Sequence, residues 1–188
     1  MFGKLLSKKH PDIEKILIPE DKIRQKVKEL AERIRNDYRD RLPVLVSVLK
    51  GSFIFLSDLV RCLEIPCNVD FIGLSSYGGA TDSTGVVRLI MDLKDTINAR
   101  DVIVVEDIVD TGLTMDYLKR NLLTRNPKSL RICSLLDKKE ARRIEVDIDY
   151  CGFSVPSEYL VGYGLDFNEL YRNLPYVGVL KREACRKK

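Results

Sequence analysis

Histidine and tryptophan are nearly absent from this sequence. Its 188 residues include one histidine, His10, and no tryptophan. Because His10 lies in a polar N-terminal segment before a proline, the sequence disfavours Ser-His-Asp catalysis, Cys-His catalysis and histidine-rich metal sites. The five cysteines form no CxxC pair and are odd in number. This argues against a disulfide framework and a structural zinc site, and predicts free thiols in a reducing cytoplasm.

The sequence also lacks a strong excess of one charge and a long apolar run. It has 32 basic and 28 acidic residues, a net charge of +4, with much of the excess at the two ends. A nucleic-acid-binding protein usually concentrates its basic charge, so we expect no nucleic-acid partner. The longest apolar stretch, residues 44–60, is interrupted by Lys50, Gly51 and Asp58. It falls short of the roughly 20 residues of a membrane span, and no signal-peptide core is present, so neither a membrane partner nor secretion is expected.

Apolar residues along the chain alternate between helical and strand-like spacing. Helical spacing predicts a helix that starts after Asp21 and ends before Pro43, and a second helix with Ser52 as N-cap and Phe53 on its apolar side. Strands are predicted at 44–49, 69–74, 86–91, 102–105 and 130–136, with a helix after 114 and short apolar runs near 150, 159–161 and 176–180. This order predicts one α/β domain over residues 1–188, with a mainly parallel twisted sheet flanked by helices.

Acidic residues cluster where the strand predicted at 102–105 ends. Glu106, Asp107 and Asp110 follow that apolar run, and acids in such a place are costly unless they face a ligand, a metal ion or water. Residues 110–114, Asp-Thr-Gly-Leu-Thr, then offer hydroxyls and consecutive N–H groups at a helix N-terminus, which favours a phosphate. The pattern predicts acids for sugar hydroxyls or a divalent cation beside a phosphate-binding loop. Two alternatives are a simple helix cap with solvated acids and a phosphoacceptor receiver domain.

Residues 105–114 resemble the phosphoribosyl pyrophosphate signature of the type I phosphoribosyltransferases. Further blocks at 48–52, 75–78, 83–85, 135–138 and 161–166 resemble the bacterial hypoxanthine-guanine phosphoribosyltransferases, in order between residues 18 and 180. The resemblance implies the type I fold, with a core at about 40–150 and a small hood from the N-terminal segment and residues about 150–180. It also implies that the polar, glycine-rich loop at 75–85, with Ser76 and Tyr77, is a flexible lid over the site.

The resemblance implies a purine-salvage enzyme. It would transfer the 5-phosphoribosyl group from phosphoribosyl pyrophosphate to hypoxanthine or guanine with Mg²⁺ as cofactor, giving IMP or GMP and pyrophosphate. It also implies a homodimer or homotetramer. Alternatives are a non-catalytic regulator with this fold and a phosphoribosyltransferase for another base. The combination of Asp110 with Lys138 argues against the regulator, and Lys138 with the block around Tyr159 argues against another base.

Roles for single residues follow from the resemblance. Asp110 would be the general acid or base near purine N7, because without a usable histidine a carboxylate must move that proton. Glu106 and Asp107 would bind the ribose hydroxyls and Mg²⁺, and Asp166 would help to hold a second ion. The residues implied for phosphoribosyl pyrophosphate are Lys50, Gly51, Glu106, Asp107, Asp110, Thr111, Gly112, Leu113, Thr114 and Arg172, with Arg142 as a second arginine near pyrophosphate.

Purine binding is implied for Lys138, Tyr159, Leu160 and Asp166. Lys138 would donate to O6, which favours 6-oxopurines over adenine; its alternative is a place on a solvated basic face. Tyr159 would stack on the base where the family usually has phenylalanine, and its added hydroxyl bears on base preference. The peptide bond between Lys50 and Gly51 would turn its N–H toward pyrophosphate, often as a cis bond, unless it is an ordinary strand-to-helix turn.

Overall fold

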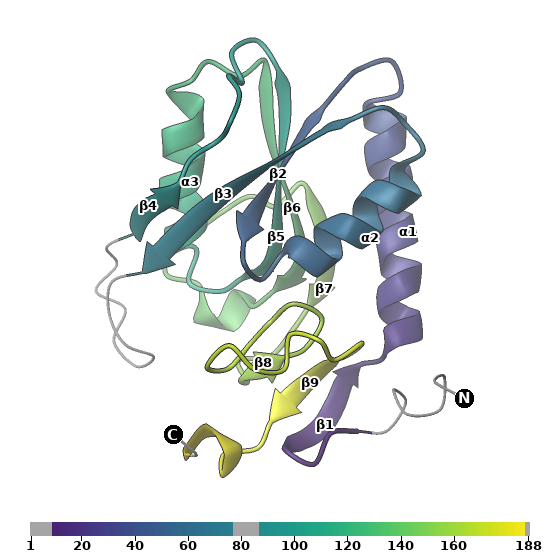
Figure 1. Ribbon diagram of the computed structural model, residues 1–188, viewed down its shortest axis with the longest axis vertical. Coiled ribbons are helices and arrows are strands. Elements are labelled where there is room, and N and C mark those ends of the chain that lie inside the picture. The colour runs from purple at the N-terminus through teal and green to yellow at the C-terminus, as the bar shows by residue number, and fades with distance from the viewer. Residues whose placement is uncertain (1–8, 77–86, 187–188) are drawn as a thin grey trace.

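The computed structural model describes residues 9–76 and 87–186 (Figure 1). Its centre is a six-stranded sheet in the order β4-β3-β2-β5-β6-β7. All neighbouring strands run parallel except β4, which pairs antiparallel with β3 at one edge. The strands are β2 (Val44–Leu49), β3 (Asn68–Ser76), β4 (Val87–Met91), β5 (Asp101–Val109), β6 (Ser129–Asp137) and β7 (Tyr150–Ser154).

Helices cover both faces of this sheet (Figure 1). One face packs against α1 (Glu20–Asp37) and α2 (Phe53–Leu63), in a core that includes Leu45 and Ile103. The other face packs against α3 (Leu113–Leu123), in a core that includes Val46 and Val104. Successive strand residues point to opposite faces, so strands buried on both sides need continuous apolar runs such as 44–46. The structure therefore confirms the predicted α/β fold with a mainly parallel sheet.

A second, three-stranded antiparallel sheet lies beyond the carboxyl ends of the main strands (Figure 1). It consists of β1 (Ile13–Ile18), β9 (Val177–Leu180) and β8 (Leu160–Val161), in that order. Its own small core includes Ile13, Val161 and Tyr176. Two short 3-10 helices, η1 (Lys139–Ala141) and η2 (Ala184–Arg186), complete the described chain. The runs near 159–161 and 176–180 thus form this second sheet and do not extend the main one.

Some local predictions were wrong. The strand predicted at 102–105 runs on to Val109, because β6 pairs with it as far as Val109 and Asp137, so Glu106 and Asp107 belong to the strand. Ser52 stands before α2 but its side chain makes no cap; its Oγ donates to the Val48 carbonyl (2.6 Å). Phe53 is exposed on α2, whose buried side chains begin at residue 55.

The helices of the described residues were compared with the requirements of a membrane span. In the ranges 9–76 and 87–186, no helix combines the length and the apolar character that a membrane span requires. The longest helix, α1, carries charged residues along its exposed side, with ion pairs between Arg24 and Glu20 and between Lys26 and Glu29.

Candidate functional site

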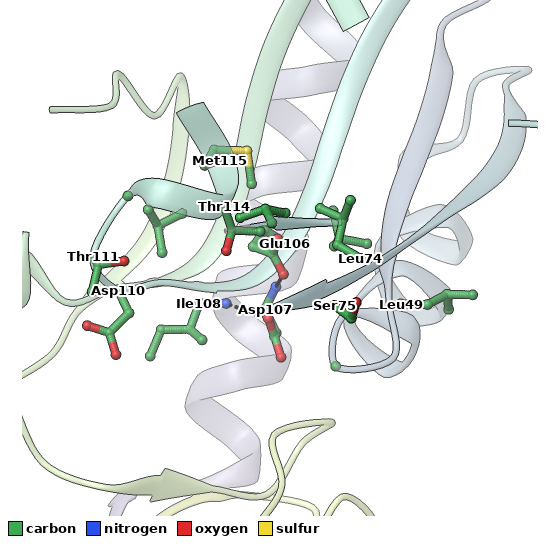
Figure 2. A pocket seen from close by; sticks show the side chains of 15 residues that line it. Leu49, Leu74, Ser75, Glu106, Asp107, Ile108, Asp110, Thr111, Thr114 and Met115 are labelled. Carbon is green, nitrogen blue, oxygen red and sulfur yellow. Dashed lines mark hydrogen bonds between the residues drawn. The ribbon is translucent and has the colours of Figure 1, made fainter. Parts of the chain in front are cut away.

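A pocket lies at the carboxyl ends of β2, β3 and β5 (Figure 2). Ligands bind at this edge in parallel α/β sheets because the strand ends and the following loops leave a crevice there. Of the residues assigned by resemblance, the pocket contains Gly51, Glu106, Asp107, Asp110, Thr111, Gly112 and Thr114. It also contains residues to which the sequence analysis gave no individual role: Val48, Leu49, Leu74, Ser75, Val87, Ile108, Val109 and Met115. The signal for several of these was their position at the ends of predicted strands.

Two carboxylates, Glu106 and Asp107, lie at the centre of the pocket and are buried (Figure 2). Their hydrogen bonds come from the backbone: the Asp107 N–H donates to Glu106 Oε1 (3.2 Å) and the Ile108 N–H donates to Asp107 Oδ1 (2.8 Å). Burial raises the pKa of Glu106 well above its usual range, with a further contribution from the Asp107 charge. Burial also raises the pKa of Asp107. A pair of buried acids that repel one another has a strong electrostatic preference for a bound cation or hydroxyl donor.

Gly51 lies directly against Asp107. A β-carbon at Gly51 would stand 1.7 Å from Asp107 Oδ2, so any larger residue here would displace this carboxylate. The cis peptide bond of this turn joins Leu49 and Lys50. The expected position, between Lys50 and Gly51, was therefore wrong by one bond: Gly51 is required by the close approach of Asp107.

The loop predicted to bind phosphate, residues 110–114, passes from the end of β5 into α3. Gly112 precedes the first residue of the helix with a φ of 84°, a left-handed conformation that favours glycine. The Thr111 carbonyl accepts hydrogen bonds from the N–H groups of Arg143 (2.9 Å) and Ile144 (3.1 Å), which hold the loop against the segment after η1. Thr111 and Thr114 both line the pocket, so their hydroxyls and the helix N-terminus face the same space as the two acids.

Asp110 and Lys138 form an ion pair. Lys138 Nζ lies 3.1 Å from Asp110 Oδ2, with the lysine largely buried and the aspartate half exposed. The register of the main sheet brings them together: Val109 of β5 pairs with Asp137 of β6, and the Lys138 N–H donates to the Val109 carbonyl (3.0 Å). This contact places a cationic donor and an anionic acceptor side by side next to the start of α3.

A second cluster lies on the loop between β8 and β9. Arg172 Nη1 donates to the Gly164 carbonyl (2.8 Å), and its Nη2 lies 2.8 Å from Asp166 Oδ1 and 3.3 Å from Glu169 Oε1. Lys50 Nζ contacts the other oxygen of Glu169 at 2.8 Å. A β-carbon at Gly164 would stand 2.0 Å from the Gly51 carbonyl oxygen, so this loop touches the turn that carries Lys50. Asp166 thus neutralises Arg172 and does not join Glu106 and Asp107 in the pocket.

The remaining expected residues are not among those that line the pocket. Arg142 forms an ion pair with the buried carboxylate of Asp137, and its Cδ lies beside Gly112, 3.2 Å from where a β-carbon of that residue would stand. Tyr159 packs edge to face on Phe167, with ring centroids 5.3 Å apart, and lines a separate hollow on the second sheet. Leu160 is buried in β8, and Leu113 is the first residue of α3. Ser76 is the last residue of β3, and Tyr77 lies outside the described residues.

The two buried acids fit a magnesium ion. Across the described ranges, no three histidine, cysteine or acidic residues form a metal-binding group. Mg²⁺ needs no such group, because it keeps several of its waters and is usually held by one or two carboxylates together with substrate phosphates. Glu106 and Asp107 are acidic, adjacent and without an ion-pair partner in the described part of the chain, which is what such a site requires. Asp166 lies with Arg172 and adds no ligand to this pair.

Comparison with known proteins gives one consistent family. Residues 17–168 match the model of the phosphoribosyl transferase domain. The chain is 46% identical over 175 residues to the hypoxanthine-guanine phosphoribosyltransferase of Mycobacterium tuberculosis, with 90% of this chain and 87% of that protein covered. The chain belongs to this family. The Bacillus subtilis member is 46% identical, with 90% of this chain and 94% of that protein covered.

Solved structures of the family have the same fold as this chain. The hypoxanthine phosphoribosyltransferase of Staphylococcus aureus superposes with a TM-score of 0.88 at 43% identity, covering 92% of this chain and 94% of that chain. The Trypanosoma cruzi enzyme superposes with a TM-score of 0.89 at 43% identity, covering 94% and 96%. Membership of the phosphoribosyltransferase family, expected from residues 105–114, is therefore confirmed along most of the chain.

Proposed function

We propose that the pocket transfers the 5-phosphoribosyl group of phosphoribosyl pyrophosphate to hypoxanthine or guanine, giving IMP or GMP and pyrophosphate. The observation that carries this proposal is the pair of buried acids, Glu106 and Asp107, beside the helix N-terminus that follows residues 111–114. Sugar hydroxyls suit the acids and a phosphate suits the helix N-terminus, so together they match a phosphorylated ribose. The family of the chain supplies the reaction class.

Charge on the leaving group explains the need for a cation. Pyrophosphate departs with several negative charges, and Mg²⁺ bound with Glu106 and Asp107 would stabilise that charge. The protein's own contribution is to hold the ribose hydroxyls on the two carboxylates and the 5′-phosphate on the N–H groups and hydroxyls of 111–114. Lys50 and Arg172, on the neighbouring turn and loop, provide cations for the pyrophosphate, and the guanidinium can bind two oxygens at once.

The ion pair of Asp110 and Lys138 suits a 6-oxopurine. Such a base presents an acceptor, O6, next to a donor, N7–H, and the protein presents a donor, Lys138 Nζ, next to an acceptor, Asp110 Oδ2, 3.1 Å apart. O6 would accept a hydrogen bond from Lys138. Asp110 would take the proton from N7 as the other nitrogen of the five-membered ring attacks C1′ and pyrophosphate leaves. Adenine would present an amino group to the lysine, a donor to a donor. We also propose that Tyr159, Leu160 and Asp166 contact the face and the edge of the same base.

Closure and assembly are further parts of the proposal. The hood would be the sheet of β1, β8 and β9, and the lid would be the predicted loop that includes Ser76, at the end of β3, and Tyr77. Exposed apolar side chains lie on one face of β3 and on β4, Val69, Phe71 and Met91, and such a patch is typical of a protein interface. We therefore propose a homodimer or homotetramer that uses this patch. The free thiols of all five cysteines suit a cytoplasmic location.

The test offers the purified protein Mg²⁺, phosphoribosyl pyrophosphate and, separately, hypoxanthine, guanine, xanthine, adenine and uracil, and follows pyrophosphate release. Release with hypoxanthine or guanine and not with adenine or uracil supports the proposal. Binding of phosphoribosyl pyrophosphate without release for any base would instead indicate a non-catalytic regulator.

Lys138→Ala sharpens the test of base recognition. We expect it to raise the KM for hypoxanthine about tenfold and to leave the KM for phosphoribosyl pyrophosphate within about twofold, since only the base contacts the lysine. Lys139→Ala, at the exposed neighbouring lysine, is the matched control and should leave both values unchanged. Equal losses for both substrates would contradict the assignment of Lys138 to the base.

A further inference from the structure

One carboxylate lies between the two cations proposed for pyrophosphate. Glu169 Oε2 contacts Lys50 Nζ at 2.8 Å, and Glu169 Oε1 contacts Arg172 Nη2 at 3.3 Å. Each oxygen of the carboxylate therefore has its own cation, on two segments far apart in the sequence. Lys50 holds the pKa of the Glu169 carboxyl below its usual range, so Glu169 is an anion at neutral pH. The arrangement is that of a bridging oxyanion bound by a lysine and an arginine.

These two contacts differ in how easily they open. The side chains of Lys50 and Glu169 are 66% and 63% exposed, and an ion pair in water is worth little and exchanges readily. Arg172 is only 17% exposed and is held independently by Asp166 Oδ1 and the Gly164 carbonyl. Loss of Glu169 would therefore leave Arg172 in place and free Lys50 for another anion.

The backbone at Glu169 is fixed without its side chain. The Glu169 N–H donates to Asp166 Oδ2 (2.9 Å), and φ is 63° at Glu169 and 50° at Asn168, which marks a tight turn in the left-handed region. The turn presents the side chain toward Lys50 while χ rotations remain available to it. Glu169 can therefore leave the two cations by side-chain rotation alone.

We propose that Glu169 is an internal anion that occupies Lys50 and Arg172 in the free enzyme and leaves when the pyrophosphate group binds. This inference rests on the proposed function, which places pyrophosphate at these two cations. By bridging them, Glu169 keeps Lys50 turned toward Arg172 before substrate arrives. By competing for them, it weakens the hold on pyrophosphate and speeds its release as product. Glu169 is thus a positioning residue that contacts the cations and not the reacting atoms.

The test is the affinity of the full-length protein for inorganic pyrophosphate in the presence of Mg²⁺, measured by titration calorimetry. Glu169→Gln keeps the size of the side chain and removes its charge, and we expect it to lower the Kd for pyrophosphate about fivefold. The KM for phosphoribosyl pyrophosphate should fall in parallel, and inhibition by product pyrophosphate should become stronger. Glu20→Gln is the matched control: Glu20 is an exposed glutamate paired with Arg24 on α1, and both values should stay unchanged.

Glu169→Gln removes a negative charge as well as the contacts to Lys50 and Arg172, so these two effects must be separated. Glu169→Asp keeps the charge but shortens the side chain by one methylene, so it cannot reach both cations. Bridging therefore predicts tighter pyrophosphate binding for Glu169→Asp, whereas a field effect predicts wild-type binding. In a Lys50→Met background the effect of Glu169→Gln should shrink to about half or less, because one of the two contacts is already gone.

Two results overturn the inference. One is a Glu169→Gln variant that binds pyrophosphate no more tightly than the wild type; the other is a Glu169→Asp variant that binds like the wild type. A wild-type protein that neither binds pyrophosphate nor releases it with any base would contradict the proposed function itself, and the two failures are therefore distinguishable.

Discussion

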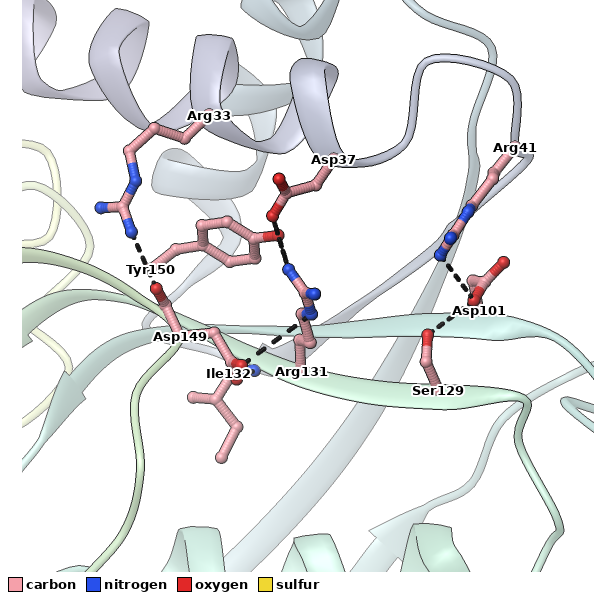
Figure 3. A network of polar contacts seen from close by, with 9 residues as sticks. All are labelled: Arg33, Asp37, Arg41, Asp101, Ser129, Arg131, Ile132, Asp149 and Tyr150. Atoms are coloured by element: carbon pink, nitrogen blue, oxygen red, sulfur yellow. Dashed lines mark hydrogen bonds and ion pairs between the residues drawn. The ribbon is translucent and has the colours of Figure 1, made fainter.

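The two ends of the main sheet place acidic residues in opposite surroundings. At the amino ends of the strands, Asp37 of α1 receives a hydrogen bond from Tyr150 Oη (2.6 Å) and pairs with Arg131 (2.5 Å), as Figure 3 shows. Nearby, Asp101 accepts a hydrogen bond from Ser129 Oγ (2.6 Å). The hydrogen bond from Tyr150, together with Arg131, holds the pKa of the Asp37 carboxyl below its usual value.

At the carboxyl ends of the same strands, the pKa values of the acids shift in the opposite direction. Burial raises the pKa of both Glu106 and Asp107, and both accept hydrogen bonds from backbone N–H groups without an ion pair to a described residue. A carboxylate with a tyrosine and an arginine stabilises the fold, because its charge is already compensated. A buried carboxylate without such a partner destabilises the free protein and gains its compensation from a ligand. The comparison separates acids that join α1 to the sheet from the acids that we propose for ligand binding.

The largest expected effect is at Asp110, which lies at the carboxyl ends yet has a lysine partner. Asp110→Asn keeps the shape of the side chain but cannot accept a proton, so kcat should fall about 10³-fold. The Kd for phosphoribosyl pyrophosphate should stay within about twofold, because the proposed role is proton transfer. Steady-state rates and equilibrium binding check this. Rates close to wild type across the pH range would show that the pair with Lys138 serves structure alone.

Asp107→Asn sharpens the comparison directly. We expect kcat/KM to fall about 10²-fold, since the amide is a poor partner for both a ribose hydroxyl and Mg²⁺. Stability should move the other way: the free energy of unfolding should rise by about 1 kcal/mol, because a buried charge next to Glu106 is removed. Urea unfolding measures the second quantity. A variant that is both inactive and less stable would contradict the view that this carboxylate strains the free protein.

Arg131→Met removes the contacts of Arg131 with Asp37 and Tyr150 at the amino ends of the main strands. The free energy of unfolding should fall by about 1 kcal/mol, because Asp37 and Tyr150 lose a shared partner that is itself partly exposed. Its kcat/KM should stay within about twofold, since the site lies at the other end of the strands. Arg120→Met, which removes an exposed pair with Asp116 on α3, is the control and should cost less than about 0.5 kcal/mol. Lost activity without lost stability would show that the two ends are coupled.

Asp37→Asn gives the smallest effect and a defined pH dependence. Because the pKa of Asp37 is lower in the folded protein than its ordinary 3.8, its contribution is complete above that value and is lost as the pH falls through the folded pKa. The stability difference between wild type and variant should therefore be constant toward neutral pH and shrink below it. Urea unfolding at about pH 7, 5 and 3 checks this. A difference that grows in acid would mean that the pKa is raised on folding.

Sequence alone predicts the parts of this molecule whose signal is local. Strand β2 was predicted at 44–49 with its observed bounds, because an apolar run interrupted only by Ser47 lies between Pro43 and the Lys-Gly turn. Strand β1 was missed, since residues 13–18 become a strand only by pairing with β9 at the other end of the chain. Strand β5 was predicted too short because Glu106 and Asp107 look like the start of a loop until β6 is placed beside them.

The same limit applies to the site. Residues 106–114 could be singled out because acids, glycine and hydroxyls are consecutive there. The partners of Asp110, Arg142 and Lys50 could not, because each contact depends on sheet register or on the path of a distant loop. The roles in catalysis assigned to these residues stay predictions for the experiments above.

The contact between Gly51 and Gly164 has a consequence for mutational tolerance. These glycines belong to different sheets, and a β-carbon on Gly164 would overlap the Gly51 carbonyl while one on Gly51 would overlap Asp107. No rotamer change can relieve the collision at Gly164, because it is with backbone, whereas at Gly51 the carboxylate of Asp107 would have to move. In a library that samples every substitution, position 164 should therefore tolerate none, and a substitution at position 51 should displace the Asp107 carboxylate, although both positions lie in loops, where substitutions are usually accepted. Selection would therefore act on the contact between these two loops, although Gly51 and Gly164 lie far apart in the sequence.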